Sequence, residues 1–114
     1  MRSVLLLLCL ATSAAAQDWA LRSGDEVVDP ATLLARSLTF YDDGVSRYSP
    51  GGSYSYTYSA LNGGGTAFGT YQIEADNSLC VLFRNGFDRC DLFVRNAGRL
   101  VLITQQGERY PVRP

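Results

Sequence analysis

Short runs of alternating apolar and polar residues fill the chain from Ser37 onward, and Gly, Asn, Asp or Pro separates each run from the next. Alternation at period two is typical of strands with one buried face, and runs recurring about every 8–12 residues indicate strands joined by hairpins. The pattern predicts a mainly β fold, an antiparallel meander of about seven to eight strands in a small barrel or sandwich. The expected strands cover residues 37–42, 45–49, 53–60, 66–74, 79–83, 88–95, 99–104 and 108–112.

One short N-terminal helix is expected before these strands. Asp29 can accept hydrogen bonds from free backbone N–H groups, and Pro30 suits the first helical position because its missing N–H would have no partner there. The helix is predicted over residues 31–36, with Leu33 and Leu34 facing the core.

Two residues inside the predicted strands indicate where those strands lie in the sheet or how closely they approach a neighbour. Gly69 interrupts a strand pattern, which indicates a bulge or a close approach of another backbone. Pro111 has no N–H for a ladder, so the last strand is expected at a sheet edge. Residues 17–28 predict an extended segment with a turn, and residues 17–114 together predict a single domain.

The first sixteen residues have the pattern of a signal peptide. Arg2 precedes the apolar run Val4–Leu10, and Ala14–Ala16 fits the small-x-small cleavage pattern. The run is too short for a membrane-spanning helix, which needs about 20 apolar residues. We therefore expect cleavage after Ala16, a periplasmic or secreted location, and no membrane insertion after cleavage.

Cys80 and Cys90 remain after cleavage, and in an oxidising compartment this pair predicts a disulfide. If residues 84–86 form a three-residue loop with Gly86 in the left-handed region, Cys80 lies directly opposite Cys90. A two-residue loop would instead pair Cys80 with Asp91. The disulfide therefore favours the longer loop.

Composition excludes several kinds of chemistry. The chain has no His, and all ten of its basic residues are Arg, so histidine catalysis, lysine Schiff bases and His-ligated metal sites are excluded. The carboxyl residues fall mostly at turns and nominate no catalytic pair, whereas an enzyme would need two inward carboxyl groups in one cleft. After cleavage, nine Arg face eleven acids, a net charge of −2 that gives no basic surface for nucleic acid. We expect no enzyme activity, no metal and no cofactor.

Tyr54, Tyr56 and Tyr58 stand at period two and share one sheet face. This ladder is either an aromatic platform for a sugar or peptide, or the buried face of the sheet with hydroxyl groups at the rim. The buried interpretation is favoured because the opposite face carries only Ser and Thr. Tyr41 and Tyr48 fit either version, as does Tyr71.

Four arginines surround the predicted disulfide hairpin, interleaved with Asp88 and Asp91: Arg84, Arg89, Arg95 and Arg99. Guanidinium groups bind carboxylates and phosphates bidentately, so the four could form an anion site. Cross-strand Arg–Asp pairs that keep an exposed hairpin soluble are the favoured interpretation, because the acids offset the charge.

The motifs LTFYDDG (38–44), GTAFGTY (65–71), CVLF (80–83) and GER (107–109) resemble small exported two-cysteine β-domain proteins of α-proteobacteria. The resemblance covers residues 31–112 and implies no activity, because such proteins are generally uncharacterised. We expect a non-catalytic binding domain that contacts a secreted protein or envelope component through exposed loops and the Arg-bearing hairpin, an inhibitor being one form. The alternative is a small-molecule carrier with a Tyr-lined barrel interior.

Overall fold

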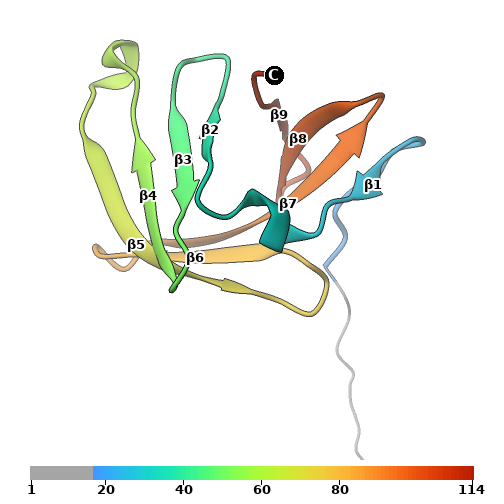
Figure 1. Ribbon diagram of the computed structural model, residues 1–114, viewed down its shortest axis with the longest axis horizontal. Helices are drawn as coiled ribbons and strands as arrows, with labels where there is room; N and C mark the ends of the chain where they lie inside the picture. Colours follow the sequence, from blue (N-terminus) through green and yellow to red (C-terminus); the bar gives the residue numbers. More distant parts are fainter. Residues whose placement is uncertain (1–16) are drawn as a thin grey trace, which may run out of the picture.

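A computed structural model describes residues 17–114, and the predicted signal peptide lies outside the described residues. One antiparallel sheet dominates the fold and curls into a half-barrel (Figure 1). Its strands are β1 (Glu26–Val27), β2 (Ser37–Thr39), β3 (Val45–Tyr48), β4 (Ser53–Thr57), β5 (Thr66–Ile73), β6 (Leu79–Phe83), β7 (Asp88–Asn96), β8 (Arg99–Thr104) and β9 (Arg109–Pro111).

The sheet is a meander in which each strand from β2 to β9 pairs with the next one in sequence. The short strand β1 departs from this path and pairs with β7. An isolated bridge between Phe40 and Val112 joins the two ends of the path, and the N–H of Arg113 donates to the carbonyl of Thr39 at 2.7 Å. The predicted antiparallel meander is therefore confirmed, and it forms a half-barrel instead of a sandwich.

The predicted α-helix over residues 31–36 is wrong. Asp29 does cap, since its side chain accepts a hydrogen bond from the backbone N–H two residues on, but a single 3-10 turn, Pro30–Leu33, follows. Ala35 then adopts a φ of 64°, and its N–H donates to the carbonyl of Tyr48 at 2.8 Å. So short a helix gains too few hydrogen bonds to offset the cost of nucleation, and contact with the sheet replaces it.

Side chains on the inner face of the half-barrel form the main core. The Tyr48 ring lies at its centre, with its centroid 4.8 Å from that of Tyr54 and 6.1 Å from that of Phe93. The tilted and edge-on geometries of these pairs are those that aromatic quadrupoles favour. Tyr54, at the start of the predicted ladder, is therefore part of the core.

The outer face of β7 and β8 is also covered, because the N-terminal segment crosses it. Trp19 is buried there, and its Nε1–H donates to Oδ2 of Asp76 at 3.1 Å. The side chains beneath it are Leu92, Val94, Val101 and Ile103. Since β7 is covered on both faces, its residues 91–94 are all buried and do not alternate.

A bidentate ion pair holds this N-terminal segment to the last strand. Both terminal nitrogens of Arg109 donate to Asp25, at 2.8 and 3.0 Å. Asn96 and the backbone N–H of Arg22 donate to the same carboxylate. Charge-assisted bidentate pairs are among the stronger polar contacts in proteins, so the pair locks segments distant in sequence together.

The hairpin between β6 and β7 has the predicted three-residue loop. Phe83 and Phe87 pair across it through an N–H···O bond of 2.8 Å, and Gly86 has a φ of 90°. Cys80 then faces Cys90 with a Cα–Cα distance of 4.0 Å, and the two form a disulfide. Both the pairing and the loop length are confirmed, and the bond is consistent with an oxidising compartment.

Candidate functional site

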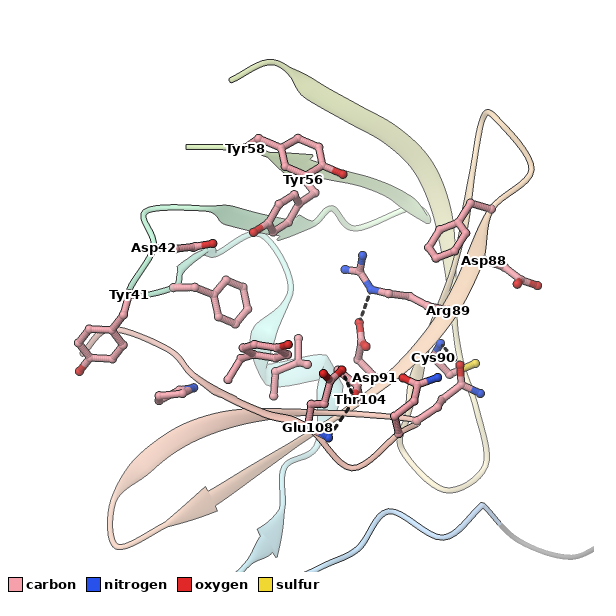
Figure 2. A pocket seen from close by; sticks show the side chains of 17 residues that line it. Tyr41, Asp42, Tyr56, Tyr58, Asp88, Arg89, Cys90, Asp91, Thr104 and Glu108 are labelled. Atoms are coloured by element: carbon pink, nitrogen blue, oxygen red, sulfur yellow. Dashed lines mark hydrogen bonds and ion pairs between the residues drawn. The ribbon is translucent and has the colours of Figure 1, made fainter. Parts of the chain in front are cut away.

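A cleft of about 690 Å³ opens on the concave side of the half-barrel (Figure 2). Its sides come from the β2–β3 turn, from β4, from the first residues of β7, and from the β8–β9 hairpin. Elements far apart in the sequence thus meet around one opening. The volume lies within the range of about 300–1,000 Å³ that is typical of small-molecule sites.

A charged side chain stands at the floor of this cleft. The Nε–H of Arg89 donates to Oδ2 of Asp91 at 2.8 Å, and its Nη2 donates to the hydroxyl of Tyr54 at 2.8 Å. That hydroxyl also forms a 2.6 Å hydrogen bond with the hydroxyl of Ser46. Figure 2 shows the guanidinium of Arg89 pointing into the opening.

Aromatic faces also surround the guanidinium. The central carbon of Arg89 lies 5.3 Å from the ring centroid of Phe83, 5.7 Å from Tyr54 and 5.9 Å from Tyr56. Each ring lies within about 6 Å, the range in which a cation is attracted to the face of a ring. Arg89 is therefore fixed in place by charge, hydrogen bonding and stacking together.

Burial dominates the electrostatics beneath Arg89. The side chain of Asp91 is 1% exposed, and burial raises the pKa of its carboxyl although Arg89 acts in the opposite direction. Burial alone would lower the pKa of Arg89, but Tyr54 and Asp91 outweigh it, so the pKa is raised and the guanidinium stays charged. Oδ1 of Asp91 has no hydrogen-bond partner among residues 17–114.

Two tyrosines of β4 and the segment after it form one wall. The rings of Tyr56 and Tyr58 meet edge to face, with centroids 4.9 Å apart. Tyr56 is half-buried and its hydroxyl packs against the Cα of Gly44, while Tyr58 is exposed. The predicted ladder thus does share one face, and it runs from a buried end at Tyr54 to an exposed end at Tyr58.

The rim of the cleft combines aromatic and acidic side chains. Tyr41, Phe87 and Tyr110 line it and are exposed. Its exposed carboxyl groups come from Asp42, Asp88 and Glu108. Sequence analysis did not identify Phe87 or Tyr110, because nothing in the pattern shows that two separate hairpins meet around one opening.

The structure separates the four arginines that were predicted around the hairpin. Arg89 lines the cleft, whereas Arg84 stacks on the ring of Phe68 at 5.2 Å. Arg99 donates to the hydroxyl of Tyr41 at 3.2 Å, and Arg95 is exposed near the end of β7.

The Arg–Asp pair of the hairpin also differs from the expected one. Arg89 binds Asp91 two residues along its own strand instead of an acid across the hairpin. The pattern held a signal for this pair, because Arg89 and Asp91 share a face with the buried Phe93. Two charges on a core-facing row require mutual pairing.

Residues 17–114 contain no group of three or more Cys, Asp or Glu side chains placed to hold a metal ion. Within the same range, no helix is long and apolar enough to cross a membrane.

The resemblance to small exported proteins of α-proteobacteria stays a prediction. Comparison of the chain with protein-family models, with curated proteins and with solved structures finds no match in any of the three.

Proposed function

We propose that this chain is an exported, non-catalytic binding domain that receives its ligand in the open cleft of the half-barrel. The observation that carries the proposal is the position of Arg89, which Asp91 and Tyr54 hold at the cleft floor while its side chain stays 29% exposed. A side chain fixed in this way is ready to bind without reorganisation, and such preorganisation favours affinity.

The alternative expectation was a small-molecule carrier with a Tyr-lined barrel interior, and the open cleft differs from such an interior. Tyr54 is buried in the core and does not line the cleft, whereas Tyr56 and Tyr58 do. The cleft is open, and its rim combines exposed aromatic and acidic side chains. These features support exchange with a ligand at the surface more than storage of an apolar molecule.

Acid–base catalysis is the competing function, since four carboxyl residues line the cleft: Asp42, Asp88, Asp91 and Glu108. Asp91 is 1% exposed and already bound to Arg89, so it has no surface from which to protonate a substrate. Glu108 is exposed and contacts Thr104 at 3.4 Å. A glycosidase needs two carboxyl groups held on either side of the reacting bond. The side chain that the structure holds in place at the cleft floor is Arg89, and we therefore favour binding.

NMR amide-shift mapping with a library of small polar compounds tests the proposal. Binding should shift the amides of residues that line the cleft, among them Tyr58, Phe87 and Arg89, and leave those around Phe68 on the outer face unchanged. The proposal would be contradicted if no compound in the library binds, or if the compounds that bind shift only amides outside the cleft.

One loop supports a second candidate, contact with another protein. Leu61 is 92% exposed in the loop between β4 and β5, and the loop is tied to the cleft rim by a 3.2 Å hydrogen bond from Asn62 to Asp42. A protruding apolar tip suits insertion into the cleft of a secreted hydrolase. Stoichiometric inhibition of such an enzyme, lost in Leu61→Ser, would support it, and a hydrolase panel without inhibition would count against it.

A further inference from the structure

The polar groups of the cleft include both donors and acceptors that have no partner. Nη1 of Arg89 makes no hydrogen bond to any described residue, although Nε and Nη2 do. Asp91 also lines the cleft, and its buried Oδ1 has no partner among residues 17–114. One donor and one acceptor of this ion pair are therefore left without a partner among the described residues. A buried group in this state costs free energy until a ligand or solvent satisfies it.

Charge narrows the class of ligand that fits. An anion would gain from Arg89, but it would also meet the carboxylates of Asp42, Asp88 and Glu108 at the rim. A cation would be attracted by those carboxylates, but an ammonium or guanidinium group only donates, so it could not accept a hydrogen bond from Nη1 of Arg89. An apolar molecule would cover Nη1 of Arg89 without giving it a hydrogen bond, at a desolvation cost. The lining thus favours a neutral ligand whose polar groups both donate and accept.

Exposed aromatic faces add a second requirement. Tyr58 directly follows β4 and Phe87 directly precedes β7, and both line the cleft and are exposed. Rings of this kind bind flat apolar surfaces, and a phenol does so with a polar group at its edge. A ligand that combines hydroxyl groups with apolar C–H faces would satisfy both the floor and the rim.

We infer that the cleft binds a neutral sugar residue, with its C–H face against Tyr58 or Phe87 and its hydroxyl groups shared between Arg89 and the acidic side chains. This inference rests on the proposed function and assigns a ligand class to the same cleft. Sugar hydroxyl groups donate and accept, so one hydroxyl can accept from Nη1 of Arg89 while others donate to the exposed carboxylates at the rim.

Titration calorimetry with defined trisaccharides tests the ligand class. The neutral probes are cellotriose, maltotriose and chitotriose, the anionic probe is trigalacturonate and the cationic probe is the glucosamine trimer. At least one neutral probe should bind with a Kd of about 1 mM or tighter, and the two charged probes should bind at least about tenfold more weakly. Pelleting with cellulose, starch or chitin particles then separates binding to free oligosaccharide from binding to a polysaccharide surface.

Variants of three aromatic residues with similar exposure test where the sugar binds. At least one of Tyr58→Ala and Phe87→Ala should weaken binding by about three- to tenfold, because the sugar stacks on one of these rings. Tyr58→Phe keeps the ring and should retain most of the affinity. Phe68→Ala is the matched control, since Phe68 is 49% exposed on the outer face, against 44% for Tyr58 and 60% for Phe87.

The outcomes separate this inference from the proposed function. Binding of a neutral probe that weakens in at least one of the cleft variants but not in Phe68→Ala supports both. Other compounds that map to the cleft, without any neutral sugar, would overturn the sugar inference alone. Preference for a charged probe would do the same. Hydrolysis of a trisaccharide would overturn the non-catalytic proposal, and binding unaffected by Tyr58→Ala and Phe87→Ala would overturn this inference.

Discussion

Arg89 and Asp91 form an ion pair within one strand, with the carboxylate buried and the guanidinium at the cleft floor. The two lie on the inner face of β7, so the same pair closes the polar side of the core and presents a charge to the cleft. The contact links stability to binding, because a change that releases Arg89 also leaves a buried carboxylate without its partner.

Arg89→Met should lower the free energy of unfolding by about 3–5 kcal/mol at pH 7, since it leaves Asp91 charged and buried without a counter-ion. The double variant Arg89→Met/Asp91→Leu should recover most of this loss, because it removes the charge that lacks a partner. Urea unfolding of wild type, both single variants and the double variant gives the coupling energy. Equal losses in Arg89→Met and the double variant would contradict the role assigned to the pair.

Asp25 should control stability in acid. The hydrogen bonds from Arg109 hold the pKa of Asp25 well below its usual range, against the opposing effect of burial. Its pKa in the unfolded chain is about 3.9, so its contribution is complete above that pH and is lost as the pH falls toward the lower folded value. Asp25→Asn should therefore lower the urea midpoint at pH 7 and make it fall less steeply between pH 5 and pH 2.

Asp91 provides a control with the opposite sign. Burial raises the pKa of Asp91 above its unfolded value, with Arg89 acting against this. The folded state then binds the proton more tightly, so the contribution of Asp91 is present at low pH and is lost as the pH rises through the folded pKa. Asp91→Asn should remove a decrease of the urea midpoint with rising pH, whereas Asp25→Asn should remove an increase of the midpoint with rising pH. Slopes that change in the same direction would contradict these assignments.

The sequence predicted local features well because they depend on neighbouring residues. The bounds of β6 and β8 agree with the predicted strands, and the loop at Gly86 fixed the register that pairs Cys80 with Cys90. These features follow from alternation and turn chemistry over a few residues. The predicted helix failed because its residues form a contact with β3, which no local pattern contains.

The cleft could not be predicted because its parts are distant in sequence. Trp19 contacts Asp76, and Arg109 contacts Asp25, over 57 and 84 residues respectively. Such contacts decide which faces of β7 are covered, and hence which of the four predicted arginines reaches the cleft. The curl that brings Phe87 to the same opening as Tyr58 is likewise a property of the whole sheet.

The disulfide should contribute substantially to stability because it closes a hairpin of ten residues' separation. The variant Cys80→Ser/Cys90→Ser should lose about 2–3 kcal/mol of unfolding free energy, mainly through a less restricted unfolded chain. Wild type treated with a reducing agent should unfold at the same urea midpoint as the variant. A reduced wild type as stable as the oxidised protein would show that the hairpin needs no link.

Two glycines are required by close contacts, and their neighbours differ in kind. A Cβ at Gly69 would collide with the backbone carbonyl of Leu82, which confirms the predicted close approach at this position. A Cβ at Gly44 would collide with the hydroxyl of Tyr56, the end of a side chain. Neither φ lies in the left-handed region, so space alone decides the effect.

Gly44→Ala and Gly69→Ala should therefore both destabilise the fold, by about 1–3 kcal/mol, as overpacking does. Tyr56→Phe should rescue part of the loss in Gly44→Ala, because it removes the hydroxyl that meets the new methyl group. The same substitution should leave the loss in Gly69→Ala unchanged, because the backbone of β6 cannot withdraw without breaking the ladder. Urea midpoints of the three single variants and the two double variants measure this difference. Equal rescue at both positions would show that Tyr56 does not pack on Gly44.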